Sequence, residues 1–109
     1  ARRDWVRDLM WNQVGILRDG EGLAAAAADL RDACNQISYA SVASPEEVEA
    51  AAMIRSARLI TEAALKRTES RGAHFRTDYP RKDPQWRKHI VLFRGEGGDI
   101  ITTFAPVLD

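Results

Sequence analysis

The 109-residue sequence contains a single cysteine, Cys34, so an internal disulfide is excluded and a reducing compartment is favoured. No apolar run approaches the ~20 residues of a membrane-spanning helix. The charged residues near the start leave no apolar segment of the kind found in secretory signals. We therefore expect a cytoplasmic protein without a membrane span. The sequence begins without methionine and enters a helical pattern almost at once, which we interpret as a piece of a longer protein.

Side chains that bind transition metals are also scarce. His74 and His89 are the only histidines, and no two residues among these and Cys34 have the spacing of zinc ligands. We therefore predict no metal site. Cys34 falls on the apolar face of a predicted helix, where a thiol acts as a small hydrophobic side chain.

The chain has no net charge, but its charges are unevenly distributed. Residues 1–65 hold seven arginines against ten acidic residues, a net charge of −3. Residues 66–94 hold nine basic and three acidic residues, a net charge of +6, and residues 95–109 hold three acidic residues. The segment after the predicted helices is therefore a basic block.

Hydrophobic periodicity predicts three amphipathic helices, over residues 3–14, 20–38 and 44–70. Asp19 and Ser44 are suitable N-cap residues for the second and third helices. The expected core-facing positions are Trp5, Val6, Leu9, Met10 and Val14, then Leu23, Ala26, Ala27, Leu30, Cys34 and Ile37, then Val48, Ala51, Ala52, Ile54, Ala57, Ile60, Ala64 and Leu65. Short connections between the helices indicate an antiparallel, up-down-up bundle.

After the helices the pattern becomes β-like. Residues 90–94 and 99–104 are rich in β-forming side chains and flank the glycine-rich segment 95–98, which predicts a hairpin. We therefore predict an all-α fold class, a three-helix antiparallel bundle with a C-terminal loop and a small β-hairpin. We expect one domain over residues 1–109, with the bundle in 1–72 and the loop and hairpin tail in 73–109.

Residues 20–25, Gly-Glu-Gly-Leu-Ala-Ala, formally fit the G-x-G-x-x-A fingerprint of dinucleotide-binding proteins. That fingerprint carries meaning only between a strand and a helix of a βαβ unit. The preceding residues are predicted to be largely helical, and no second parallel strand follows. We interpret the segment as a helix start after a short turn, and we predict no cofactor-binding residue in this chain.

The most distinctive stretch is residues 69–80, Glu-Ser-Arg-Gly-Ala-His-Phe-Arg-Thr-Asp-Tyr-Pro. Gly72 is suited to the left-handed residue that often ends a helix, and Pro80 excludes further helix. The charged groups suit either an acid/base pair or a helix end tied to a loop by charge-assisted hydrogen bonds, and we favour the second because no cleft is evident. We predict no catalytic residue here. The candidate structural and interface residues are Glu69, Ser70, Arg71, Gly72, His74, Arg76, Asp78 and Tyr79.

This stretch resembles the signature near the C-terminus of the flavoproteins related to succinate dehydrogenase, fumarate reductase and L-aspartate oxidase. Residues 10–20, Met-Trp-Asn-Gln-Val-Gly-Ile-Leu-Arg-Asp-Gly, resemble the helix that opens the C-terminal domain in the L-aspartate oxidase branch. Trp86 and His89 resemble a feature of the succinate dehydrogenase branch. The resemblance covers roughly residues 3–90.

The resemblance implies a full-length FAD enzyme that oxidises L-aspartate to iminoaspartate, the first step of de novo NAD synthesis in bacteria. It implies that the flavin and substrate sites lie upstream, so this chain has a structural and docking role against the flavin-binding and capping domains. The equivalent domain of a succinate dehydrogenase or fumarate reductase flavoprotein is the alternative.

A small binding module is a further alternative, because Phe75, Tyr79, Trp86 and Phe93 interleave with the basic block. No nucleic-acid motif accompanies them, so we do not expect nucleic acid as a partner. These aromatic rings exceed what three short helices can cover. We therefore expect an apolar patch through which the isolated domain can self-associate.

Overall fold

The computed structural model describes residues 2–37, 44–95 and 99–107. Three α-helices come first: α1 (Arg2–Gln13), α2 (Gly20–Gln36) and α3 (Pro45–Lys66). A short 3-10 turn, η2 (Pro84–Trp86), then leads into strands β1 (Lys88–Arg94) and β2 (Ile100–Pro106). None of the helices in these ranges combines the length and apolarity needed to cross a membrane.

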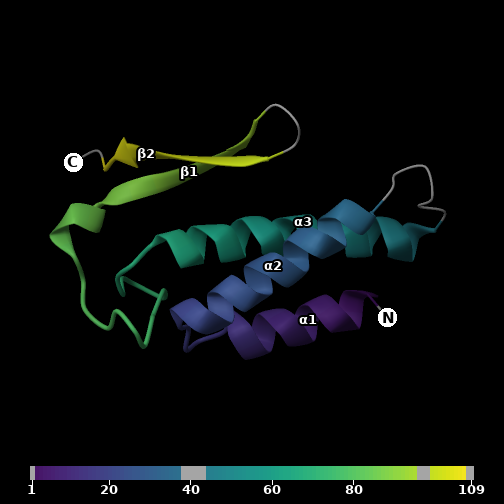
Figure 1. The fold of residues 1–109 in the computed structure, drawn as a ribbon, viewed down its shortest axis with the longest axis horizontal. Helices are drawn as coiled ribbons and strands as arrows, with labels where there is room; N and C mark the ends of the chain where they lie inside the picture. The colour runs from purple at the N-terminus through teal and green to yellow at the C-terminus, as the bar shows by residue number, and fades with distance from the viewer. Residues whose placement is uncertain (1, 38–43, 96–98, 108–109) are drawn as a thin grey trace.

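The two strands make the predicted all-α class wrong. β1 and β2 form a two-stranded antiparallel sheet with seven paired positions, from Lys88 opposite Pro106 to Arg94 opposite Ile100. The sheet lies over α3, on the side away from α1 (Figure 1), and no residue of either strand is fully buried. The fold is therefore mixed α and β. The hairpin itself was predicted correctly, and the middle of its turn, residues 96–98, lies outside the described residues.

The helix starts follow the capping residues that the sequence offers. Asp19 accepts a hydrogen bond from the Gly22 amide (2.6 Å), and Ser44 accepts one from the Glu47 amide (3.2 Å). These contacts confirm both predicted N-caps. The predicted end of the second helix at residue 38 lies just outside the described residues.

The third helix ends earlier than predicted, at Lys66 instead of Ser70. Arg67 leaves the helical region with φ −80° and ψ 101°. The physical reason is that Arg67, Glu69 and Ser70 are used for long-range polar contacts described below, which a continued helix would pull apart.

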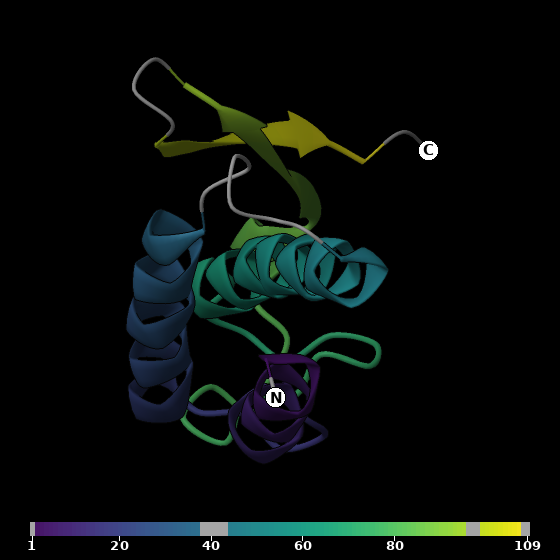
Figure 2. The ribbon, with the colours of Figure 1, turned by 90° about the vertical axis from the view of Figure 1, so that its right-hand side faces the viewer.

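Successive helices run in opposite directions, and α2 crosses α3 obliquely (Figures 1 and 2). Their shared core consists of small and branched side chains, namely Val6, Leu9, Val14, Leu23, Ala26, Leu30, Ile54, Ala57 and Ala64. Trp5, Val48, Ala52 and Ile60 were predicted to face this core, but all four are exposed, with exposed fractions of 40%, 58% and 51% for Trp5, Val48 and Ile60. The buried stripe of each helix is narrow and does not include these positions.

Candidate functional site

The segment that follows α3 folds into two consecutive tight turns. Arg71 and His74 exchange both backbone hydrogen bonds (2.8 and 3.0 Å), and the amide of Tyr79 donates to the carbonyl of Arg76 (3.1 Å). Gly72 has φ 59°, which confirms the predicted positive φ. It occupies the first central position of the 71–74 turn and not a helix end, and only glycine adopts that geometry at little cost.

The second turn is fastened to the segment between α1 and α2. Arg18 and Arg76 form an isolated parallel bridge, in which the Arg18 amide donates to the Phe75 carbonyl (3.0 Å) and the Thr77 amide donates to the Arg18 carbonyl (2.6 Å). Residues far apart in the sequence thus lie side by side at one end of the molecule (Figure 1).

Arg76 is the most deeply buried cation at this end, with only 3% of its surface exposed. Its Nη1 donates to the Leu65 carbonyl (2.8 Å) and the Arg67 carbonyl (3.3 Å), which are among the groups that the end of α3 leaves unpaired. Its Nε and Nη2 donate to both carboxylate oxygens of Asp78 (3.1 and 2.8 Å). Arg76 therefore caps α3 and holds Asp78 at the same time.

Asp78 completes the link to α2. Its Oδ2 accepts a hydrogen bond from the Gly20 amide (2.8 Å), at the first residue of the helix. The bond from Arg76, and to a lesser extent the one from the Gly20 amide, lowers the pKa of Asp78 below its ordinary value. A Cβ atom on Gly20 would lie 2.7 Å from both Arg76 Nη2 and Asp78 Oδ2, so a larger residue here would have to displace this ion pair.

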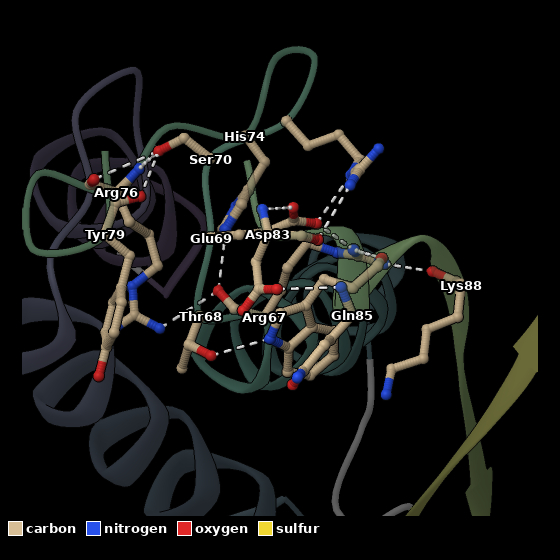
Figure 3. Close-up of polar contacts among 12 residues, drawn as sticks. Arg67, Thr68, Glu69, Ser70, His74, Arg76, Tyr79, Asp83, Gln85 and Lys88 are labelled. Carbon is tan, nitrogen blue, oxygen red and sulfur yellow. Dashed lines mark hydrogen bonds and ion pairs between the residues drawn. The ribbon is translucent and has the colours of Figure 1, made fainter. Parts of the chain in front are cut away.

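Glu69 is the fully buried anion of the site (Figure 3). Its Oε2 accepts from Arg67 Nη1 (2.6 Å) and Arg71 Nε (2.8 Å), while its Oε1 accepts from the Asp83 amide (2.9 Å). Burial acts to raise the pKa of Glu69, but the bonds from Arg71, Asp83 and Arg67 outweigh it and lower the pKa to about 2. Glu69 is therefore ionised throughout the physiological range.

Arg67 extends this cluster to the sheet. Its guanidinium donates to the carbonyls of Trp86 and Lys88, at 2.7 Å each, and lies over the indole ring of Trp86. The indole Nε1 donates to Thr68 Oγ1 (2.9 Å). Arg67 and Trp86 thus attach the start of β1 to the end of α3.

His74 lies between two arginines. Its Nδ1 is 2.8 Å from Arg18 Nη1, and its Nε2 is 3.2 Å from the Arg67 carbonyl. Because a guanidinium can only donate, Nδ1 must accept and Nε2 must carry the proton. Burial, assisted by the nearby positive charges of Arg18, Arg67 and Arg76, lowers the pKa of His74 despite the opposing hydrogen bond to the Arg67 carbonyl. His74 is therefore neutral at pH 7.

Ser70 and Tyr79 hold the two turns against each other. The Ser70 hydroxyl accepts from the Arg76 amide (2.9 Å) and donates to the Tyr79 carbonyl (2.8 Å). The Tyr79 ring lies beneath the Arg76 guanidinium, with 4.9 Å between the guanidinium carbon and the ring centroid. All eight predicted candidate residues thus lie in one segment after α3, and seven of them contribute side-chain contacts to it, Gly72 contributing its backbone conformation.

Several participants were not among the candidates, and three of them form central contacts: Arg18, Arg67 and Gly20. Arg67 had a partial signal, as a basic residue beside a helix end. Arg18 and Gly20 had none, since their partners lie 56 and 58 residues away in the sequence. The position of Arg71 after the third helix predicts that its guanidinium bonds the helix carbonyls, Glu69 or Asp78. In the structure it binds Glu69 and the Asp83 carbonyl, and Arg76 takes the helix end.

The arrangement is suited to holding segments together and not to moving protons. Within the described ranges, no group of three or more His, Cys, Asp or Glu side chains is placed to hold a metal ion. The Gly20 and Gly22 amides, which a dinucleotide phosphate would need, already donate to Asp78 and Asp19. The Gly20 and Gly22 amides are therefore not available to a flavin phosphate.

The family described as the fumarate reductase flavoprotein C-terminal region matches residues 3–108. An L-aspartate oxidase of Rhodospirillum rubrum is 48% identical over 79 residues, covering 72% of this chain and 26% of that protein. A fumarate reductase (CoM/CoB) polypeptide of Methanothermobacter marburgensis is 32% identical over 100 residues, covering 84% of this chain and 18% of that protein.

A solved structure of the Mycobacterium smegmatis Sdh1 complex in its apo form contains a similar fold. It superposes with a TM-score of 0.71 at 30% identity, over 91% of this chain and 19% of that chain. The chain therefore spans between about a fifth and a quarter of the length of these relatives.

Proposed function

The chain belongs to the fumarate reductase flavoprotein C-terminal family, and from this membership we propose that it is the C-terminal domain of an FAD-dependent L-aspartate oxidase. The observation that carries the proposal is the 48% identity to the Rhodospirillum rubrum enzyme, against 32% to the Methanothermobacter marburgensis fumarate reductase. The parent would oxidise L-aspartate to iminoaspartate in NAD biosynthesis, with FAD bound by the part of the polypeptide that precedes this chain.

In this proposal the chain contributes no reacting group. The carboxylates of Glu69 and Asp78 are neutralised by Arg67, Arg71 and Arg76 at 2.6 to 2.8 Å. Such groups are poor candidates for proton transfer, because their charges are fixed by their partners. Their role is to hold the loop at 69–80 rigid at the end of the helices, so that the domain presents a fixed surface to the flavin-binding part.

The succinate dehydrogenase and fumarate reductase flavoproteins remain the second candidate, because several relatives carry the latter name at 32–33% identity. The deciding experiment is a substrate comparison with the full-length parent loaded with FAD. L-aspartate oxidation with succinate inert supports the proposal. Succinate oxidation or fumarate reduction without L-aspartate turnover overturns it in favour of the second candidate.

A further inference from the structure

The bridge between residues 18 and 76 has an unusual distribution of polar and apolar side chains. Side chains alternate between the two faces of an extended segment, so Arg18 and Arg76 share one face while Leu17 and Phe75 share the other. The cations face the protein, since Arg76 is 3% exposed and Arg18 contacts His74. The apolar neighbours face outward, with Leu17 67% and Phe75 37% exposed.

The same end of the molecule carries two more exposed apolar side chains. Trp11, in the last turn of α1, is 73% exposed, and Ile16, just beyond that helix, is 75% exposed. We call Trp11, Ile16, Leu17 and Phe75 the outer patch. Trp11, Ile16 and Leu17 are the most exposed large hydrophobic side chains in the part of the chain that the structure describes. Trp11, Ile16 and Leu17 are close in the sequence, and the bridge between residues 18 and 76 holds Phe75 beside this segment. Exposed apolar side chains gathered in this way are typical of a contact site.

We infer that the outer patch is the surface that docks on the preceding, flavin-binding part of the same polypeptide. The inference rests on the proposed function only for the statement that such a part exists. This chain matches only 26% and 18% of the length of two relatives. In the proposed parent, most of the polypeptide therefore lies outside this chain. The bridge and the contacts of Arg76 with Asp78 and the end of α3 hold the backbone beneath the patch in place, as a docking surface requires.

The size of the patch favours this occupant over a second copy of the chain. A stable complex between separate proteins typically buries about 1,600 Å², which is more than four side chains supply. A domain covalently joined to its partner needs less, because the linkage supplies a high effective concentration. Inter-domain surfaces within one chain are correspondingly smaller, about 600–1,500 Å².

Cysteine protection tests the inference directly. Leu17→Cys and the control Val48→Cys are made in a Cys34→Ser background, both in the isolated chain and in the full-length parent with FAD. Val48 is 58% exposed on the first turn of α3, so it is an aliphatic position of comparable exposure to Leu17. Maleimide labelling of each site is followed by mass spectrometry of its peptide.

Both cysteines are expected to label at similar rates in the isolated chain. In the parent, labelling at position 17 is expected to slow by about tenfold or more while position 48 is unchanged. Equal labelling at position 17 in both contexts overturns the inference, as does concentration-dependent protection in the isolated chain, which would assign the patch to a second copy. Ile16→Cys repeats the test if Leu17→Cys fails to fold. If the parent oxidises succinate and position 17 is still protected, the docking inference stands and only the proposed substrate is wrong.

Discussion

Arg76 and Asp78 form a two-bond ion pair (3.1 and 2.8 Å) that joins the C-terminal end of α3 to the N-terminal end of α2. Arg76 also binds the carbonyls of Leu65 and Arg67, and Asp78 binds the amide of Gly20. Each charge thus lies at the helix end whose partial charge is opposite to its own. The pair lets two helix ends of opposite polarity meet at one place.

Replacing Arg76 by lysine is expected to lower the free energy of unfolding by about 2 kcal/mol. An ammonium keeps the charge but cannot hold both oxygens of Asp78 and the α3 carbonyls together. Urea denaturation followed by circular dichroism measures the loss. Arg81→Lys, at an exposed position nearby, is the matched control and should leave the unfolding midpoint in place. Equal midpoints for the two variants would show that the fork of Arg76 is dispensable.

Gly20→Ala is expected to destabilise the chain by about 1–2 kcal/mol. Its new methyl group would lie 2.7 Å from Arg76 Nη2 and Asp78 Oδ2, so the ion pair would have to shift. Alanine is otherwise preferred in helices, and a stabilised variant would therefore contradict the structure. Gly72→Ala is the comparison, because a Cβ atom there would meet nothing within 4 Å, and its expected loss of about 1 kcal/mol comes from the positive φ alone. Thermal unfolding midpoints show which of the two variants is less stable.

Glu69→Gln is expected to cost about 3 kcal/mol at pH 7, because it leaves Arg67 and Arg71 without their buried anion. It should also change how the free energy of unfolding falls at acid pH. The pKa of Glu69 is about 2 in the folded state against 4.5 ordinarily, so its contribution is complete above pH 4.5 and is lost as the pH falls toward 2. Unfolding free energies measured from pH 7 to pH 2 should fall less steeply for the variant below pH 4.5. Parallel curves would show that Glu69 is not the group responsible.

The parts of the fold that depend on neighbouring residues were predictable from the sequence. The caps at Asp19 and Ser44 act within three residues, and the hairpin follows from two β-rich runs around glycines. The fold class was predicted wrongly because the hairpin was treated as a tail, although seven paired positions make it a sheet. The division at residues 72 and 73 stays a prediction, and Arg67 already binds across it to Lys88.

The polar cluster was predictable in membership but not in pairing. Residues 69–80 contain charged groups that must pair if buried, yet the sequence does not say which arginine reaches which carbonyl. Arg71 and Arg76 both follow α3 closely, and only the two turns decide that Arg76 points back to the helix. Arg18 joins from 56 residues away, and contacts of that separation leave no local pattern.

The isolated chain is expected to bind no FAD. The Gly20 and Gly22 amides already donate to carboxylates, and no βαβ unit precedes them within the described ranges. Titration of FAD with the chain should leave flavin fluorescence unchanged, and the FAD-loaded parent is the positive control. Saturable quenching by the isolated chain would contradict the prediction and would place part of the flavin site in this domain.

His74 is expected to be neutral at pH 7, with its proton on Nε2. The Arg18 guanidinium donates to Nδ1 (2.8 Å), and Nε2 donates to the Arg67 carbonyl (3.2 Å). A proton on Nδ1 would remove this acceptor and place an N–H group against the Arg18 cation. The folded-state pKa of His74 lies below its ordinary value of 6.5. Its contribution to stability is therefore complete above pH 6.5 and is lost as the pH falls through the folded pKa. Long-range ¹⁵N–¹H correlation spectra at pH 7 should show an unprotonated Nδ1 for His74, with the exposed His89 as internal comparison. His74→Gln should make the free energy of unfolding fall less steeply just below pH 6.5. The fall below pH 4.5 that is assigned to Glu69 should be unchanged. A His74 ring protonated on Nδ1 at pH 7 would mean that Arg18 does not donate to it, and the link between the α1–α2 segment and the first turn would have to be reassigned.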